Sequence, residues 1–136
     1  MKKMNNITVR IEVEVHPTEN VEKVKQAVEN LFGKVEYETK PYNHGCLLIA
    51  KTRGTEGLTK LYNLLRRERI RDAARSVLFK AKTENTITFY LNKQVAYAGH
   101  VSFCQAAGES PLGPIKIEIT CENPTELINW LAPKTG

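Results

Sequence analysis

The 136-residue chain has no long apolar run, few cysteines and only an ordinary supply of aromatic residues. No stretch approaches the roughly 20 apolar residues of a membrane-spanning helix, so we expect no membrane span. The three cysteines, Cys46, Cys104 and Cys121, are scattered and odd in number, which fits reduced thiols in a cytoplasmic protein better than a disulfide framework. Aromatic residues make up 7% of the chain, and the RNP-type motif of a base-stacking sheet is absent.

The chain also lacks the motifs of common catalytic and metal sites. The segment 54–60 combines glycines with a lysine near a helix start, but it lacks P-loop spacing, and Glu56 would repel a phosphate. No serine has a G-x-S-x-G setting, and the carboxylates are dispersed over solvated faces. His44 and Cys46 have no second ligand pair at the spacing of a zinc finger. We therefore expect no enzymatic activity, no metal site and no cofactor.

The length and the charge of the chain limit the number of domains and the kinds of partner that we expect. A chain of this length fits a single domain over residues 1–136, whose core needs no disulfides. Hydrophobic residues at 41% and charged residues at 26% are typical of a globular protein. The net charge of +5 and the pI of about 9.2 mildly favour anionic partners such as nucleic acids or phosphates.

Hydrophobic periodicity predicts the element order β-α-β-β-α-α-β-β-β-α. Apolar and charged residues alternate from Ile7 to Val15, as in a half-buried strand. Five further strands are expected, over residues 34–39, 46–50, 86–91, 95–103 and 115–121. Turns or loops are expected at 41–45, 92–94, 105–110 and 111–114. Hairpins mixed with helices predict an α+β fold, a largely antiparallel sheet with helices packed on one face.

Capping residues mark the ends of the expected helices. Thr18 or Asn20 precedes the first helix, and Gly33 closes it. A second helix is expected to start at Thr55. Asn123 followed by Pro124 is a helix start, so the last helix is expected over residues 125–131.

The most informative stretch is LRRERIRDAARSVLFK, residues 65–80. Its apolar residues fall in two stripes: at 100° per residue, the leucines at 58, 61 and 65 centre roughly 140° away from the stripe at 70, 73, 74 and 77. One straight helix cannot bury both stripes against the same surface. We therefore expect a break between Leu65 and Ile70 that places the first arginines of the stretch at a corner between two helices.

Five arginines in this stretch are the candidate binding residues: Arg66, Arg67, Arg69, Arg71 and Arg75. Only Glu68 and Asp72 oppose them locally, and the planar guanidinium fork suits phosphate. We expect Lys93 and Gln94, in the turn expected at 92–94, to support these contacts. Tyr90 and Tyr97 are candidates for an open sheet face where bases could stack. The alternative is structural, a clasp of ion pairs at a helix or subunit junction.

Four stretches resemble a family of small archaeal proteins: HPTENVEKVKQAVENLF, LLRRERIRDAARSVLF, FYLNKQVAYAGHVSF, and SPLGPIKIEI with the downstream WLAP. Together they run in order through nearly the whole chain. The resemblance implies a fold like that of the ribosomal large-subunit protein that binds 5S rRNA. It also implies a homodimer and RNA binding by analogy, and it supplies no catalytic residues.

The leading hypothesis is a non-enzymatic protein, expected to be a homodimer, that binds structured RNA through the arginine-rich helix junction. Two alternatives stay open at this point. The protein could be an accessory subunit that pairs its arginines with acids of another protein and binds no nucleic acid. It could also bind a phosphorylated small molecule, for which a deep pocket beside the arginines would be the sign.

Overall fold

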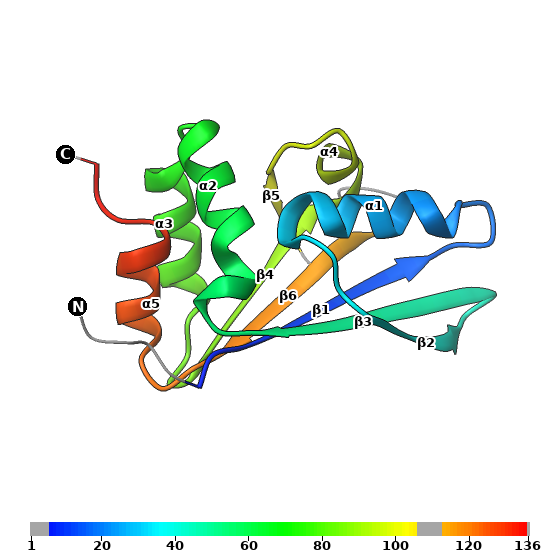
Figure 1. The fold of residues 1–136 in the computed structure, drawn as a ribbon, viewed down its shortest axis with the longest axis horizontal. Helices are drawn as coiled ribbons and strands as arrows, with labels where there is room; N and C mark the ends of the chain where they lie inside the picture. Colours follow the sequence, from blue (N-terminus) through cyan, green and yellow to red (C-terminus); the bar gives the residue numbers. More distant parts are fainter. Residues whose placement is uncertain (1–5, 106–112, 136) are drawn as a thin grey trace.

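The computed structural model describes residues 6–105 and 113–135, which form a six-stranded antiparallel sheet and five α-helices (Figure 1). The strands lie in the order β2-β3-β1-β6-β4-β5. Their bounds are β1 Thr8–Val15, β2 Tyr37–Tyr42, β3 Gly45–Arg53, β4 Thr86–Asn92, β5 Phe103–Cys104 and β6 Pro114–Thr120. The predicted α+β class with an antiparallel sheet is confirmed.

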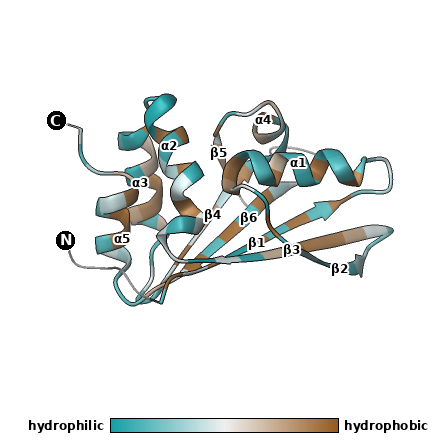
Figure 2. Ribbon diagram, in the orientation of Figure 1, coloured by the Kyte–Doolittle hydropathy of each residue, from teal (hydrophilic) through white to brown (hydrophobic). Residues whose placement is uncertain are grey.

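Strict alternation along the central strands gives the sheet one apolar face. In β1, Val9, Ile11 and Val13 are buried, whereas the residues between them are half-buried and charged. The same alternation runs through β6 and β4, and the register pairs Ile11 with Ile117, and Ile117 with Phe89. Figure 2 shows hydrophobic and hydrophilic residues alternating in bands along these strands. A one-residue slip would expose this whole apolar set, so the pattern fixes the register.

The helices cover the apolar face (Figure 1). Over one end of the sheet lie α1 (Val21–Phe32) and the short α4 (Lys93–Tyr97), and over the other lie α2 (Thr59–Arg67), α3 (Arg71–Ala81) and α5 (Pro124–Leu131). A 3₁₀ turn, Thr55–Leu58, leads into α2. The helices contribute buried residues such as Val28, Leu61 and Leu78 to one core shared with the strands.

Cap residues set the helix ends as expected in two cases. The Oδ1 atom of Asn20 accepts the N–H groups of Glu22 and Lys23, and the Gly33 N–H donates to the carbonyl of Glu29. The Oδ1 atom of Asn123 caps α5 by accepting the N–H of Glu126, with Pro124 in the first turn. The first and last helices therefore start where their sequence signals place them.

The structure corrects three sequence-based boundaries. The strand expected at 34–39 lies at Tyr37–Tyr42, so the hairpin turn is shorter than the predicted 41–45. The chain at 92–97 is not a turn followed by a strand but helix α4, because Asn92 Oδ1 accepts the N–H of Val95 at 2.9 Å. Of the strand expected at 95–103, only Phe103 lies in a strand, the short β5, which pairs with β4. Most of the loop expected at 105–110 and half of the turn expected at 111–114 lie outside the described residues.

Candidate nucleic-acid interface

The arginine stretch folds as two helices joined by a tight turn, as predicted. Helix α2 ends at Arg67 and α3 begins at Arg71. The turn is closed by two backbone bonds, from the N–H of Ile70 to the carbonyl of Leu65 at 3.1 Å and from the N–H of Arg69 to the carbonyl of Arg66 at 3.1 Å. The three residues of the turn, 68–70, thus separate the two apolar stripes, so that each stripe lies on its own helix. The five arginines separate into two groups that face different neighbours.

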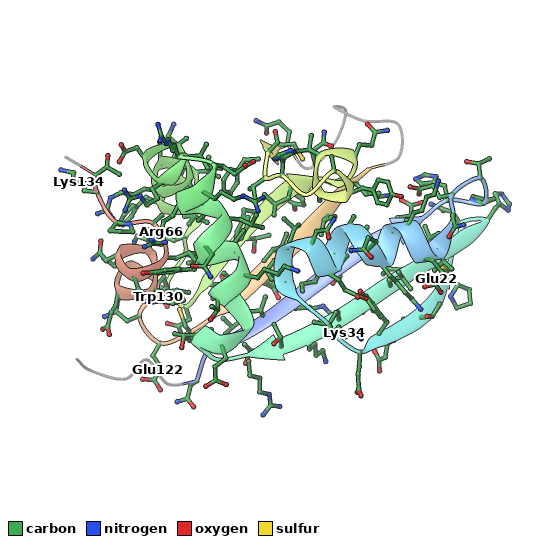
Figure 3. All side chains as sticks on the ribbon, turned by 45° about the horizontal axis from the view of Figure 1, so that its top comes forward. Glu22, Lys34, Arg66, Glu122, Trp130 and Lys134 are labelled. Atoms are coloured by element: carbon green, nitrogen blue, oxygen red, sulfur yellow. The ribbon has the colours of Figure 1, made fainter. Side chains whose placement is uncertain are left out.

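The first group holds the end of helix α5. Arg66 Nη1 donates to the carbonyls of Tyr62 at 2.9 Å and Leu131 at 3.2 Å, and Nη2 donates to the carbonyl of Trp130 at 3.3 Å. The guanidinium lies 3.3 Å from the centroid of the Tyr62 ring, which packs against Trp130 at 4.7 Å. Figure 3 shows Arg66 and Trp130 on the neighbouring helices α2 and α5. Arg66 therefore satisfies carbonyls that the last turn of α5 leaves unpaired.

Arg75 also binds a carbonyl at the end of α5, that of the residue after Leu131. Its Nη1 donates to the carbonyl of Ala132 at 3.2 Å, and its guanidinium lies over the Phe79 ring at 4.8 Å. We call Arg66 and Arg75 the α5 clasp. Burial lowers the pKa of the Arg66 guanidinium from its ordinary value, and the nearby positive charge of Arg71 acts in the same direction.

The second group, which we call the arginine corner, consists of Arg67, Arg69 and Arg71. The Arg67 side chain is 61% exposed, and its Nη2 donates to the carbonyl of Gly99 at 2.8 Å. Arg69 is exposed and Arg71 is half-buried. Within residues 6–105 and 113–135, neither Arg69 nor Arg71 makes a side-chain hydrogen bond or ion pair. These guanidinium groups are therefore available to an external anion.

The acids near the corner already have partners. Glu68 Oε1 lies 2.9 Å from His100 Nδ1, and its Oε2 lies 3.9 Å from Arg67 Nε. Asp72 accepts hydrogen bonds from the side chain and backbone of Thr135, and the hydroxyl bond is the main reason that the pKa of Asp72 lies below its ordinary value. Three arginines against these two carboxylates leave the corner with a net positive charge.

Arg69 adopts a backbone conformation that arginine rarely takes. Its φ is 58°, in the left-handed region where a helix-ending turn usually places glycine. We predict that Arg69→Gly is more stable than Arg69→Ala by about 1 kcal/mol, because only glycine lacks the Cβ that strains this conformation. Urea denaturation of both variants measures the difference. Equal stabilities would show that the backbone at position 69 is not strained.

Lys93 and Gln94 lie in the first turn of helix α4 and not in the turn that the sequence suggested at 92–94. The Lys93 side chain is 5% exposed, and its Nζ donates to the Glu14 carbonyl at 2.7 Å and to the Glu19 carboxylate at 3.1 Å. This ammonium ties β1 and the start of α1 to α4. It is not presented to a phosphate at the surface, so we leave it out of the arginine corner. Gln94, by contrast, is exposed.

The outer face of the sheet has its charges balanced. Cross-strand neighbours pair Arg10 with Glu118 and Glu12 with Lys116, and Arg10 Nε also contacts Glu12 at 2.7 Å. Like Thr86 and Thr88, Tyr90 alternates with the buried residues of β4 and is half-buried on this face. The expectation that Tyr97 shares it is wrong, because Tyr97 ends α4 on the helical side. A balanced face attracts anions less than the arginine corner does.

Comparison with known proteins places this fold in a family. A model of a family described as RNA binding matches residues 8–121. A UPF0201 protein of Sulfurisphaera tokodaii is 46% identical over 126 residues, covering 93% of this chain and 87% of that protein. The crystal structure of the UPF0201 protein from Methanococcus jannaschii superposes with a TM-score of 0.84 at 38% identity and covers 95% of both chains. The chain belongs to the UPF0201 family.

Membership of UPF0201 confirms the archaeal family that the four sequence stretches suggested. A UPF0201 protein of Thermococcus kodakarensis, 45% identical over 127 residues and covering 93% of this chain and 90% of that protein, agrees. The likeness to the ribosomal protein that binds 5S rRNA stays a prediction. In the described part of this UPF0201 chain, no three His, Cys, Asp or Glu side chains gather as a metal site would require. No helix there is long and apolar enough to cross a bilayer.

Sequence reasoning missed the residues around the start of α4 in this UPF0201 protein. Glu19 and Lys23, at the start of α1, face α4, where Tyr97 is 47% exposed. A signal for the helix was present, because Asn92 is a good N-cap and Gly99, with φ of 90°, follows the last turn. The alternation of Val95, Tyr97 and Val101 outweighed that signal and suggested a strand.

Proposed function

We propose that this UPF0201 protein binds RNA without catalysing a reaction, and that Arg67, Arg69 and Arg71 contact phosphates. The observation that carries the proposal is the arginine corner itself, where three arginines lie in and beside one tight turn. Two of them, Arg69 and Arg71, have no partner among the described side chains. The match to a family model described as RNA binding and the net charge of +5 support it.

The start of α3 adds a second attraction for a phosphate. Ile70 occupies the N-cap position, and no side chain caps the backbone N–H groups there. Uncapped N–H groups at a helix N-terminus, together with the helix dipole, favour an anion. Arg71 is the first residue of this helix, so its guanidinium and the N–H groups lie at the same corner. One phosphate could therefore receive bonds from both.

The strain at Arg69 supports a role for its side chain. A positive φ at a residue other than glycine raises the free energy of the folded state, and such conformations cluster at functional sites. Arginine offers nothing to the turn itself, since its side chain makes no bond with another described residue. Phosphate contact gives a reason for arginine at this position.

A fluorescence anisotropy titration against a labelled RNA hairpin tests the proposal. The triple variant Arg67→Ala, Arg69→Ala, Arg71→Ala should bind roughly 10- to 100-fold more weakly at about 100 mM salt, because it loses phosphate contacts. Between about 50 and 200 mM salt, the slope of log affinity against log salt should become shallower by about 2 to 3.

The matched control removes the same charge elsewhere. Lys34, Lys40 and Lys51 are exposed residues of the β2–β3 side, and Figure 3 shows Lys34 well away from Arg66. Their triple alanine variant has the same net charge as the corner variant and should keep near wild-type affinity. Equal losses of RNA affinity in the two triple variants would show that the binding site does not lie at the arginine corner. No binding by the wild-type protein at low salt would overturn the function.

The finer expectations concern assembly and location. The homodimer implied by the family resemblance and the cytoplasmic location indicated by the cysteines both stay predictions. Structured RNA, with paired and unpaired parts, remains the RNA that we propose as partner.

A further inference from the structure

A pocket of about 340 Å³ opens between the start of α1 and the start of α4. It is separate from the arginine corner, because none of Arg67, Arg69 and Arg71 lines it. Its lining mixes polar, apolar and aromatic side chains: Thr18, Glu19, Asn20, Lys23, Val24, Ala27, Lys93, Gln94 and Tyr97. Its volume lies within the range of small-molecule sites.

The pocket offers one group for each part of a nucleotide. The ring of Tyr97, 47% exposed, is a stacking surface, and the Lys23 ammonium lies 6.0 Å from its centroid. Val24 and Ala27 are buried apolar residues of α1. Gln94 supplies an exposed amide that can both donate and accept hydrogen bonds. Stacking on an aromatic ring with hydrogen bonds at the base edge is how proteins hold unpaired bases.

A buried ion pair in the pocket favours the base of a nucleotide over its phosphate. Lys93 and Glu19 have side-chain exposures of 5% and 11%, and Lys93 Nζ lies 3.1 Å from Glu19 Oε1. Because Glu19 already neutralises Lys93, the inner pocket has no free positive charge to hold a phosphate. Glu19 Oε1 already accepts the His16 N–H and the Lys93 ammonium, but Oε2, which among the described residues accepts only from Lys93, can take a further N–H group from the edge of a base. The base therefore faces inward, and the phosphate stays near Lys23.

The backbone that carries the Tyr97 ring is held in place by α1. Asn30 Nδ2 donates to the carbonyls of Ala96 at 3.0 Å and Tyr97 at 3.1 Å. The N-cap bond from Asn92 fixes the other end of α4. A fixed backbone means that binding has to order only the side-chain torsions of Tyr97 and not the segment that carries it.

The pocket is connected to the arginine corner through the chain that follows α4. Gly99, whose carbonyl accepts the Arg67 bond, is two residues after Tyr97, so their Cα atoms are at most about 7 Å apart. His100, next in the chain, contacts Glu68 in the corner turn. An RNA strand with phosphates on the corner can thus present a neighbouring base to Tyr97.

We propose that the pocket between α1 and α4 binds one unpaired base of the RNA whose phosphates contact the arginine corner. The base stacks on Tyr97, its edge bonds to Gln94 and Glu19, and the adjoining phosphate lies near Lys23. This inference rests on the proposed function and adds a preference to it. The protein selects RNA with an unpaired nucleotide beside the phosphates that the corner holds.

The test compares a labelled RNA hairpin with the fully paired duplex of equal length. Wild-type protein should prefer the hairpin, and Tyr97→Ala should weaken hairpin binding by about 5- to 150-fold, the range for loss of one stacked base. Duplex binding by the same variant should stay unchanged. Tyr97→Phe keeps the ring and should retain the preference. A 2-aminopurine in the loop should be quenched by wild type and less by Tyr97→Ala.

Tyr42 provides the matched control, since it is 46% exposed on β2 and does not line the pocket. Tyr42→Ala should leave both affinities at the wild-type level, and thermal melts establish that both alanine variants are folded. Equal hairpin and duplex affinities of the wild-type protein, or an unchanged hairpin preference in Tyr97→Ala, would overturn the proposal that the pocket binds a base. The proposed function would still be upheld if duplex binding were lost only in the triple variant of the arginine corner. Absence of all RNA binding would overturn both.

Discussion

Replacing Glu19 with alanine should lower the free energy of unfolding by about 3 to 5 kcal/mol, because it leaves a buried ammonium without its counter-ion. The Lys93 side chain is only 5% exposed and is held by the Glu19 carboxylate and the Glu14 carbonyl. Glu19 also accepts the backbone N–H of His16 at 2.9 Å. Its removal thus weakens the joint of β1, α1 and α4 at several points. Urea denaturation followed by circular dichroism measures the loss.

The exposed Glu36 supplies the control for this prediction. Glu36→Ala removes the same charge and should change the stability by no more than about 0.5 kcal/mol, as is usual at a solvated position. The double variant Glu19→Ala, Lys93→Met should recover part of the loss, since it no longer buries a lone charge. Similar stabilities for Glu19→Ala and Glu36→Ala would show that the pair is not buried in solution.

Local sequence patterns predicted most of the sheet and the long helices. The alternation from Ile7 to Val15 and the caps Asn20 and Asn123 are local signals, and each produces the expected element. The break between α2 and α3 also follows from local information, the phase of two apolar stripes. Helix α4 was missed because five residues are too few for helical periodicity to appear.

The division of the arginines could not be predicted, because it depends on distant parts of the chain. Arg66 binds carbonyls 64 and 65 residues away, and Arg75 binds one 57 residues away. Nothing in the stretch 65–80 distinguishes these two side chains from Arg67 or Arg71. Only the packing of α5 beside α2 and α3 turns one basic stretch into a clasp and a corner. One segment thus contains a structural clasp, made by Arg66 and Arg75, and a separate corner whose arginines we propose contact phosphates.

Substitutions in the α5 clasp should lower the stability of the protein more than substitutions in the arginine corner. Arg66→Ala should destabilise the protein by about 3 kcal/mol and lower the melting temperature by about 10 °C, because the α5 carbonyls lose their charged donors. Arg67→Ala removes a mostly exposed side chain with one bond, to Gly99, and should cost less than about 1 kcal/mol. Differential scanning calorimetry measures both.

RNA affinity should follow the opposite order. At a temperature where both variants are folded, Arg67→Ala should weaken hairpin binding and Arg66→Ala should weaken it less, although each variant loses one positive charge. Arg66→Lys sharpens the comparison, since it keeps the charge but loses the planar fork that bonds Trp130 and Leu131 and stacks on Tyr62. It should melt earlier than wild type and bind RNA equally well. If Arg66→Lys weakened binding as much as Arg67→Ala did, the clasp would belong to the binding surface, and the separation of roles inferred from the contacts of Arg66 would be wrong.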